Sequence, residues 1–251
     1  MIDQIKTIVN SFEEISLREI EKVAALLDRI DLKFTINIRE LPEILEFVKP
    51  YYSSLCIEDK RIMQYKSLYF DTADFNLYKI HHNGKLNRYK VRIREYSDTN
   101  TVFFETKFKN NKGRTLKKRF VKHNEFELEE KESEFVREMT NIDPTSLKAG
   151  IYVYYKRATL VNSKSGERVT IDIDLTFKNE TKEEKFSNVV IIEVKSSKGN
   201  KNSPLLEVLR KKKIEQFGIS KYCLGVSSLI DDVKRNNFKE KLLTLNKLNV
   251  K

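Results

Sequence analysis

Basic side chains recur at every second position in several short stretches of this chain, and this spacing could bind a row of phosphate groups. Arg92 and Arg94 lie two residues apart, as do Lys117 and Arg119. Residues two apart on a β-strand point to the same face. Because a guanidinium group can bind two phosphate oxygens at once, Arg92 and Arg94 could hold successive phosphates of a triphosphate or a longer polyphosphate.

The same alternation runs through eight stretches, whose charged faces carry more bases than acids. The bases are Arg29, Lys33, Arg88, Lys90, Arg92, Arg94, Lys107, Lys109, Lys117, Arg119, Arg157, Arg168 and Lys195, and the acids are Asp31, Glu105, Asp172, Asp174 and Glu193. One such strand alone is typical of a sheet with a solvated charged face. Because like charges on neighbouring strands destabilise a sheet, the combined surplus indicates an anionic ligand.

The eight stretches predict an antiparallel sheet. They are Arg29–Ile36, Gln64–Asp71, Leu86–Tyr96, Thr101–Lys109, Thr115–Val121, Ile151–Val161, Arg168–Phe177 and Val189–Ser197. Eight strands can close into a small barrel, which removes exposed edges. If the apolar faces pack outward against helices, the charged faces line the interior. We therefore expect an α+β fold with a closed eight-stranded antiparallel β-barrel, a basic tunnel and flanking helices; an open sheet is the alternative.

Helices are predicted where apolar residues recur at helical spacing. The expected ranges are 16–27, Arg39–Val48, Ser133–Thr140, Ser203–Phe217 and about 231–245. The chain has 251 residues with only 7 Gly and 4 Pro, and no repeat or linker divides it. We expect a single domain over residues 1–251.

Composition favours a soluble protein that binds polyanions. Lys and Arg number 48 against 37 Asp and Glu, a net charge of +11, and the hydrophobic content of 39% supports a folded core. No apolar run is long enough to cross a membrane, and the N-terminal residues lack the apolar block of a signal peptide. The expected location is the cytoplasm.

Other common chemistries lack their residues. There is no Gly-x-x-x-x-Gly-Lys-Ser/Thr phosphate loop, histidine-based nucleophilic triad or zinc motif. The histidines, His81 and His82 beside Asn83-Gly84 and the isolated His123, are expected at the surface. Cys56 and Cys223 are expected to be core thiols.

Several strands resemble the vacuolar transporter chaperone (VTC) polyphosphate polymerase domain, a branch of the triphosphate tunnel metalloenzyme superfamily. The motifs, in the family's order, are Asp28-Arg29-Ile30-Asp31-Leu32-Lys33-Phe34, Ser67-Leu68-Tyr69-Phe70-Asp71-Thr72, Lys90-Val91-Arg92-Ile93-Arg94-Glu95-Tyr96, Phe104-Glu105-Thr106-Lys107, Arg168-Val169-Thr170-Ile171-Asp172, Ile192-Glu193-Val194-Lys195 and Ser220-Lys221-Tyr222. They define a core of about 28–225. Asp31 stands where the family usually has Glu, and Phe34 where it usually has Tyr. The resemblance implies a free-standing catalytic domain of the bacterial type.

The resemblance also implies roles for single residues. Catalytic phosphate contacts are expected from Lys33, Arg92, Arg94, Lys107, Arg157 and Lys195. Ser220 and Lys221 resemble a Ser-Lys pair that closes the tunnel and touches phosphate. Lys117 and Arg119 are expected to bind the product chain or the outer phosphate of the donor, and salt bridges to nearby carboxylates are their alternative role.

Glu193 is the first candidate for a metal ligand, with Asp31, Asp172 and Asp174 as weaker ones. Mg²⁺ and Mn²⁺ prefer oxygen ligands, and one or two protein carboxylates commonly hold them while they bridge phosphate oxygens. The expected cofactor is therefore Mn²⁺ or Mg²⁺. The alternative role of Glu193 is that of a buried partner for nearby bases.

The resemblance implies a metal-dependent polymerase that transfers the γ-phosphate of ATP to inorganic polyphosphate and releases ADP. A tripolyphosphatase or nucleoside triphosphatase of the same fold, and a non-catalytic polyphosphate-binding subunit, remain alternatives. The net charge alone would also suit a nucleic-acid-binding protein, but the basic faces carry few aromatic residues for base stacking, so no specific nucleic-acid partner is expected. A membrane-protein partner is possible, and the oligomeric state stays open.

Overall fold

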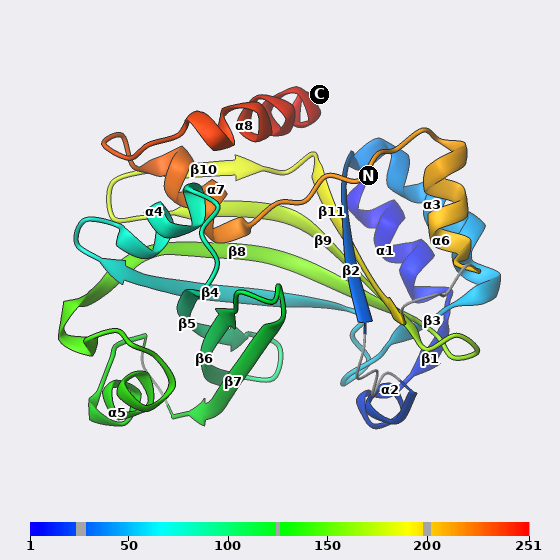
Figure 1. The fold of residues 1–251 in the computed structure, drawn as a ribbon. Coiled ribbons are helices and arrows are strands. Elements are labelled where there is room, and N and C mark those ends of the chain that lie inside the picture. Colours follow the sequence, from blue (N-terminus) through cyan, green and yellow to red (C-terminus); the bar gives the residue numbers. More distant parts are fainter. Residues whose placement is uncertain (24–28, 124–125, 198–201, 251) are drawn as a thin grey trace.

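The computed structural model describes residues 1–23, 29–123, 126–197 and 202–250, which form an α+β fold around one large sheet (Figure 1). Eight strands follow one another in the order β2-β11-β9-β8-β4-β5-β6-β7, and each neighbouring pair is antiparallel. Their bounds are β2 (Arg29–Asn37), β4 (Ile62–Thr72), β5 (Arg88–Tyr96), β6 (Thr101–Lys109), β7 (Thr115–Lys122), β8 (Leu147–Asn162), β9 (Glu167–Lys178) and β11 (Val189–Ser197). These are the eight strands that the alternating pattern predicts.

Three short strands lie beside this path, and the sequence pattern did not predict them. They are β1 (Glu13–Ile15), β3 (Ser53–Leu55) and β10 (Glu183–Phe186). β1 pairs in parallel with β3, β3 pairs with β8, and β10 pairs with β9. Segments of three or four residues are too short for alternation to distinguish a strand from a loop.

Helices flank the sheet. Their bounds are α1 (Ile2–Asn10), α2 (Leu17–Val23), α3 (Leu41–Val48), α4 (Asn76–His82), α5 (Glu130–Met139), α6 (Pro204–Lys211), α7 (Lys221–Leu229) and α8 (Asn236–Asn249). α2 is the first part of the predicted helix 16–27, whose residues 24–27 lie outside the described ranges. The predicted helices over 203–217 and 231–245 were misplaced, since α6 ends at Lys211 and α8 begins at Asn236. Within the ranges described, no helix is both long enough and apolar enough to span a membrane.

The outer face of the sheet is apolar and packs against four helices (Figure 1). α1, α3 and α6 cover β2, β8, β9 and β11, and Ile5, Leu45 and Leu209 are buried between them. α5 covers β4, β5 and β6 through the buried Val136. Since side chains alternate along a strand, the charged residues of these strands face the other side, which we call the inner face. Apolar faces were expected to pack outward against the predicted helices. α3, α5 and α6 pack in this way, whereas α8, which overlaps the predicted helix 231–245, packs with α7.

α7 covers part of the inner face. Tyr222, Leu224 and Val226 of this helix lie in a buried cluster with Ile151 of β8 and Phe177 of β9. α4 and α8 pack against α7 and also contact the sheet, α4 at β4 and β5 and α8 at β2, β10 and β11 (Figure 1). This contact places the N-terminus of α7, with Ser220 and Lys221, beside the charged part of the inner face.

A β-bulge in β9 changes which residues face inward. Before it, Ile171 and Ile173 pack with the outer helices, whereas after it Leu175 and Phe177 pack beneath α7. Asp174 lies between them with a positive φ of 56° and forms an ion pair with Lys156, its Oδ2 lying 2.8 Å from Nζ. The bulge inserts an extra residue and reverses the alternation. The expectation that Asp174 shares the charged face with Asp172 was therefore wrong.

Hydrogen bonds do not close the described sheet into a barrel. β2 and β7 end the strand order, and no pairing joins them. Instead, the free edge of β2 is bonded by the segment before α7, where Phe217 N donates to Lys33 O at 2.8 Å and Phe34 forms a bridge with Gln216. The expectation of a closed eight-stranded barrel is thus not met in its hydrogen bonding, because another segment occupies the edge that β7 would have to join.

Candidate functional site

Arg92 on β5 is held between two neighbouring strands. Its Nε donates to Glu105 Oε2 on β6 at 2.7 Å, and its Nη1 donates to the hydroxyl of Tyr69 on β4 at 2.8 Å. These residues lie directly opposite one another across the strands. Arg94, two residues on, donates from Nε to Ser67 Oγ at 3.0 Å and is buried. Both guanidinium groups are therefore fixed on the inner face.

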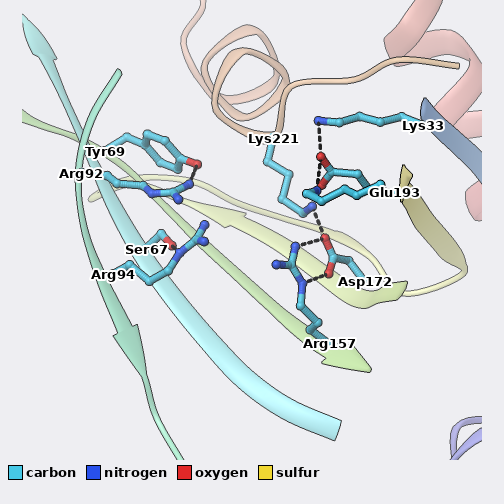
Figure 2. Close-up of polar contacts among 10 residues, drawn as sticks. Lys33, Ser67, Tyr69, Arg92, Arg94, Arg157, Asp172, Glu193 and Lys221 are labelled. Atoms are coloured by element: carbon cyan, nitrogen blue, oxygen red, sulfur yellow. Dashed lines mark hydrogen bonds and ion pairs between the residues drawn. The ribbon is translucent and has the colours of Figure 1, made fainter. Parts of the chain in front are cut away.

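Arg157 on β8 approaches the same region from the other side (Figure 2). It lies opposite Asp172 of β9 and binds that carboxylate twice, Nε to Oδ1 at 2.5 Å and Nη2 to Oδ2 at 2.8 Å. Lys221, from the start of α7, donates to the same Oδ2. Burial alone would raise the pKa of Asp172, but the charges of Arg157 and Lys221 outweigh it and lower the pKa to about 2. Asp172 thus forms ion pairs with two cations of the inner face.

Glu193 of β11 forms a third group of charged residues with Lys195 and Lys33. Its Oε1 lies 2.5 Å from Lys195 Nζ and 3.9 Å from Lys33 Nζ, which extends from the neighbouring β2. Burial would raise the pKa of Glu193, yet Lys33 and Lys195 hold it well below its usual range. Burial lowers the pKa of Lys195, and the charges of Glu193 and of the exposed Asp31, which lies opposite Lys195 on β2, partly offset this.

Cations from distant positions in the strand order repel one another across the inner face. Burial, together with the charges of Lys90, Lys33 and Arg92, lowers the pKa of Lys107 on β6 to about 8. Lys33 lies on β2, which is at one end of the strand order. β6, which carries Lys107, is next to β7 at the other end. The start of α7 joins the two sides, since Phe217 N donates to Lys33 O of β2 and Ser220 Oγ accepts from Lys90 Nζ of β5. The sheet therefore curls around the charged inner face, although hydrogen bonds between strands do not close it.

Tyr69 is an acidic tyrosine in this setting. Burial would raise the pKa of its hydroxyl, but Arg92, Arg94 and Lys90, together with the hydrogen bond from Arg92, lower it to about 7. A phenol that ionises this readily reports a strongly positive local potential. The same potential would favour the binding of any other anion.

Lys117 and Arg119 of β7 lie beside Glu105. Lys117 forms an ion pair with its Oε1, and Arg119 Nη1 lies 4.0 Å from the same atom. Arg119 also lies over the Phe103 ring at 4.3 Å. Burial lowers the pKa of Lys117 to about 8 although Glu105 opposes this. The alternative role of these two residues, salt bridges to a nearby carboxylate, is thus observed, and both remain on the face that the other cations share.

Ser220 caps α7 and joins it to β5. Its Oγ accepts from Cys223 N at 3.3 Å and from Lys90 Nζ at 2.7 Å. Together with the ion pair of Lys221, these contacts tie the start of α7 to strands on both sides of the inner face.

Aromatic side chains lie beneath Arg94 and Arg157 on the inner face. Tyr65 and Tyr155 stack with ring centroids 5.0 Å apart, and Arg94 and Arg157 both lie over this pair, 5.2 to 5.8 Å from the centroids. The Tyr155 hydroxyl is buried, and the described atoms offer it no hydrogen-bond partner. Buried hydroxyls are normally paired, so a ligand among these cations would satisfy it.

The donor set suits a metal only if a substrate supplies most of its ligands. In the described ranges, no three His, Cys, Asp or Glu side chains come together to hold a metal. Glu193 is a single carboxylate beside Lys33 and Lys195, and Mg²⁺ and Mn²⁺ are often held by one or two carboxylates plus phosphate oxygens. Glu193 therefore fits a metal that arrives with a phosphorylated substrate.

Some residues of the site were missed. Lys90, Tyr69 and Ser67 received no role, although Lys90 continues the two-residue spacing of Arg92 and Arg94 and could have been found from it. The partners on β4 depend on strand register, for which the sequence has no local signal. The histidines were also misplaced in part, since His82 is buried, with its Nε2 accepting from Asn237 N at 3.3 Å.

Comparison with known proteins identifies a family and a fold. The model of the VTC domain family matches residues 28–230. No curated protein matches the chain. Among solved structures, a putative adenylyl cyclase from Hippeastrum, for which a dominant triphosphatase activity is described, matches with a TM-score of 0.51 and 15% identity over 81% of this chain and 98% of its own. A putative adenylate cyclase from Vibrio parahaemolyticus gives a TM-score of 0.48 at 11% identity, covering 79% and 98% of the two chains. At 15% identity, the similarity to the Hippeastrum structure supports the fold and nothing beyond it.

Proposed function

This chain belongs to the VTC domain family, and we propose that it is a polyphosphate polymerase that transfers the γ-phosphate of ATP to a polyphosphate chain and releases ADP. The family match and the tunnel fold support an enzyme acting on polyphosphate or a triphosphate. The choice of polymerase rests on the motifs over residues 28–225 and on the site they form.

The observation that carries the proposal is the convergence of cations from both ends of the sheet. Burial lowers the pKa of Lys90 of β5 and of Lys107 of β6, and the charge of Lys33 on β2 acts on both in the same direction. A folded protein keeps such mutual repulsion at a cost in stability unless a ligand offsets it. A linear polyanion enclosed by these side chains is the ligand that would offset it over the whole surface.

The residues of the site provide what phosphoryl transfer requires. A terminal oxygen of the polyphosphate chain forms a bond to the γ-phosphorus of ATP, while the bond from that phosphorus to the β–γ bridging oxygen breaks and ADP leaves with the electron pair. Catalysis of this step consists mostly of alignment and charge neutralisation. Arg92, Arg94 and Arg157 are held by neighbouring side chains in positions from which to bind successive phosphates. The acceptor oxygen is already anionic at neutral pH, so no general base is needed.

Further cations would align the two substrates. Lys33, Lys107 and Lys195 lie around the same surface, and Lys117 and Arg119 extend it along β7. Glu193 would hold Mn²⁺ or Mg²⁺ together with phosphate oxygens. That ion would add positive charge to the phosphates in the transition state.

The test is the product of a single incubation. Purified protein is given ATP, Mn²⁺ or Mg²⁺ and a short polyphosphate seed, and the polymers are resolved on a gel while ADP and free phosphate are quantified. The proposal expects a lengthening ladder with equivalent ADP, lost in Arg92→Ala and in Glu193→Gln. Free phosphate in amounts equal to ADP, with no ladder, would make the protein a triphosphatase. Binding of polyphosphate without either product would make it a binding subunit.

A further inference from the structure

Two neighbouring cross-strand pairs of β5 and β6 consist of bases alone. Arg88 lies opposite Lys109, and Lys90 lies opposite Lys107. Further along the same strands a carboxylate interrupts the series, because Glu105 lies opposite Arg92. No acidic residue in the described part of the chain forms an ion pair with Arg88 or Lys109. Directly opposed like charges destabilise a sheet, so this end of the inner face indicates an anion of its own.

His81 of α4 faces the same end. Burial lowers the pKa of its imidazole to about 2, and the charges of Lys90, Arg88, Lys109 and Lys241 act in the same direction. Lys241 belongs to α8, where the Phe238 ring lies 6.2 Å from that of His81, and Lys241 Nζ donates to Gly218 O at 2.5 Å. The Nδ1 atom of His81 is buried and has no hydrogen-bond partner among the described atoms. A buried polar atom of this kind is a group that a ligand can satisfy.

These residues lie at the far end of the row from Arg94. Arg88 precedes Arg94 by six residues on one strand, a distance of about 20 Å, and Arg92 by four, about 14 Å, whereas Lys109 lies only about 7 Å beyond Lys107. Between them, Lys90 and Arg92 continue the row on the same face of β5. A ligand that reaches from one end of this row to the other must be longer than a triphosphate.

We propose that His81 of α4, Arg88 of β5, Lys109 of β6 and Lys241 of α8 form a subsite for the distal part of a long polyphosphate chain. The inference rests on the proposed function in taking polyphosphate as the ligand. A chain that follows this row places a negative charge at every repeat and needs no room for bases, whereas a single-stranded nucleic acid would require aromatic platforms along its length.

The test compares two ligands on the full chain, tripolyphosphate and a polyphosphate many times longer. In the double variant Arg88→Gln/Lys109→Gln, we expect the affinity for the long polymer to fall about tenfold. Its salt dependence should weaken by about 0.7 in slope for each basic side chain that no longer neutralises a phosphate. The affinity for tripolyphosphate should stay within about twofold of wild type, because that ligand is too short to reach from Arg92 to the subsite.

The matched control removes the same charge elsewhere. Lys118 and Lys148 are exposed strand residues outside the proposed site, so Lys118→Gln/Lys148→Gln should leave both affinities near those of wild type. An equal loss for both ligands in the Arg88/Lys109 variant, or no loss for either, would overturn the subsite. Should that variant fail to fold, His81→Gln is measured in the same way, and an unchanged affinity for the long polymer would overturn it.

The subsite and the polymerase can fail separately. If wild type makes no ladder from ATP while the Arg88/Lys109 variant loses only long-chain binding, the polymerase is rejected and the subsite stands. If a ladder forms but the loss of binding does not depend on ligand length, the subsite is rejected and the polymerase stands.

Discussion

Tyr69 and Arg92 lie directly opposite each other on β4 and β5, and the Arg92 guanidinium donates a 2.8 Å hydrogen bond to the Tyr69 hydroxyl. Glu105 binds the same guanidinium from β6 with a 2.7 Å hydrogen bond from Nε. A cation held by two neighbouring strands would need little reorganisation to bind an anionic ligand. Because Arg92 also lowers the pKa of the Tyr69 hydroxyl, a substitution of Tyr69 tests the positive potential at this position.

Tyr69 is expected to make stability depend on pH above neutrality. Its pKa in the folded protein is about 7, against 10.0 for an ordinary tyrosine. Between these values the unfolded state binds more protons, so stability rises with pH. We expect the stability of wild type relative to Tyr69→Phe to rise over this interval by up to about 1.4 kcal/mol per pH unit. Urea unfolding at a series of pH values checks this, and parallel pH profiles for the two proteins would contradict it.

Lys107 is expected to take up a proton when polyphosphate binds. Burial and neighbouring cations lower its pKa to about 8, and a bound polyanion would raise it again. Above that pH, binding should therefore consume protons, and the affinity should fall as the pH rises. Calorimetry in two buffers of different ionisation enthalpy measures the uptake. The Lys107→Met variant should show a smaller uptake, and an unchanged value would assign the proton elsewhere.

Asp172 is expected to offset the repulsion between Arg157 and Lys221. A bound phosphate ligand could offset the same repulsion. Asp172→Asn would leave Arg157 and Lys221 unpaired in a buried position, at an expected cost of about 3 kcal/mol. Tripolyphosphate should reduce that cost, because its charges would replace the missing carboxylate. Thermal unfolding with and without tripolyphosphate gives the answer, and a deficit unaffected by the ligand would count against a phosphate site here.

The control for that substitution lies in the same strand. Asp174 forms its ion pair with Lys156, away from Asp172, and both members of that pair are partly exposed. Asp174→Asn should therefore cost no more than about 1 kcal/mol, with no dependence on tripolyphosphate.

Gly225 is expected to fix the position of α7 on the sheet. A Cβ at this position would lie 2.4 Å from Ile151 Cδ1 and 2.9 Å from Phe177 Cδ1. Gly225→Ala should therefore destabilise the protein by about 1–3 kcal/mol. Gly218→Ala, where a Cβ meets nothing within 4 Å, should be nearly neutral. Denaturant unfolding of both variants checks the contrast, and similar stabilities would show that α7 does not pack as described.

The strands and the inward-facing residues could be predicted because both follow from alternation with a period of two. Thr101–Lys109 and Val189–Ser197 were predicted with the bounds that β6 and β11 have. The pattern failed at Asp174, where one extra residue reverses the faces and leaves no mark in the alternation of residue types. It also failed for α4, a seven-residue helix that begins after Phe75, whose backbone is left-handed.

The pairings within the site could not be predicted from the sequence. Whether Arg157 meets Asp172, or Arg92 meets Glu105, depends on strand register, which the whole sheet determines. The relation of Lys33 to Lys107 depends in addition on how far the sheet curls. The family resemblance indicated that all four basic residues belong to one site, but not which carboxylate would hold each of them.

The central claim is that the two ends of the sheet bind the same polyanion, and a double-mutant cycle on Lys33 and Lys107 tests it most directly. Tripolyphosphate affinity is measured for wild type, Lys33→Met, Lys107→Met and the double variant. Each substitution should weaken binding, and the two effects should differ from additivity by about 0.5 kcal/mol or more, as for groups that share a ligand. Full affinity in either single variant, or strict additivity, would mean that β2 and β6 do not hold one ligand and would contradict the account.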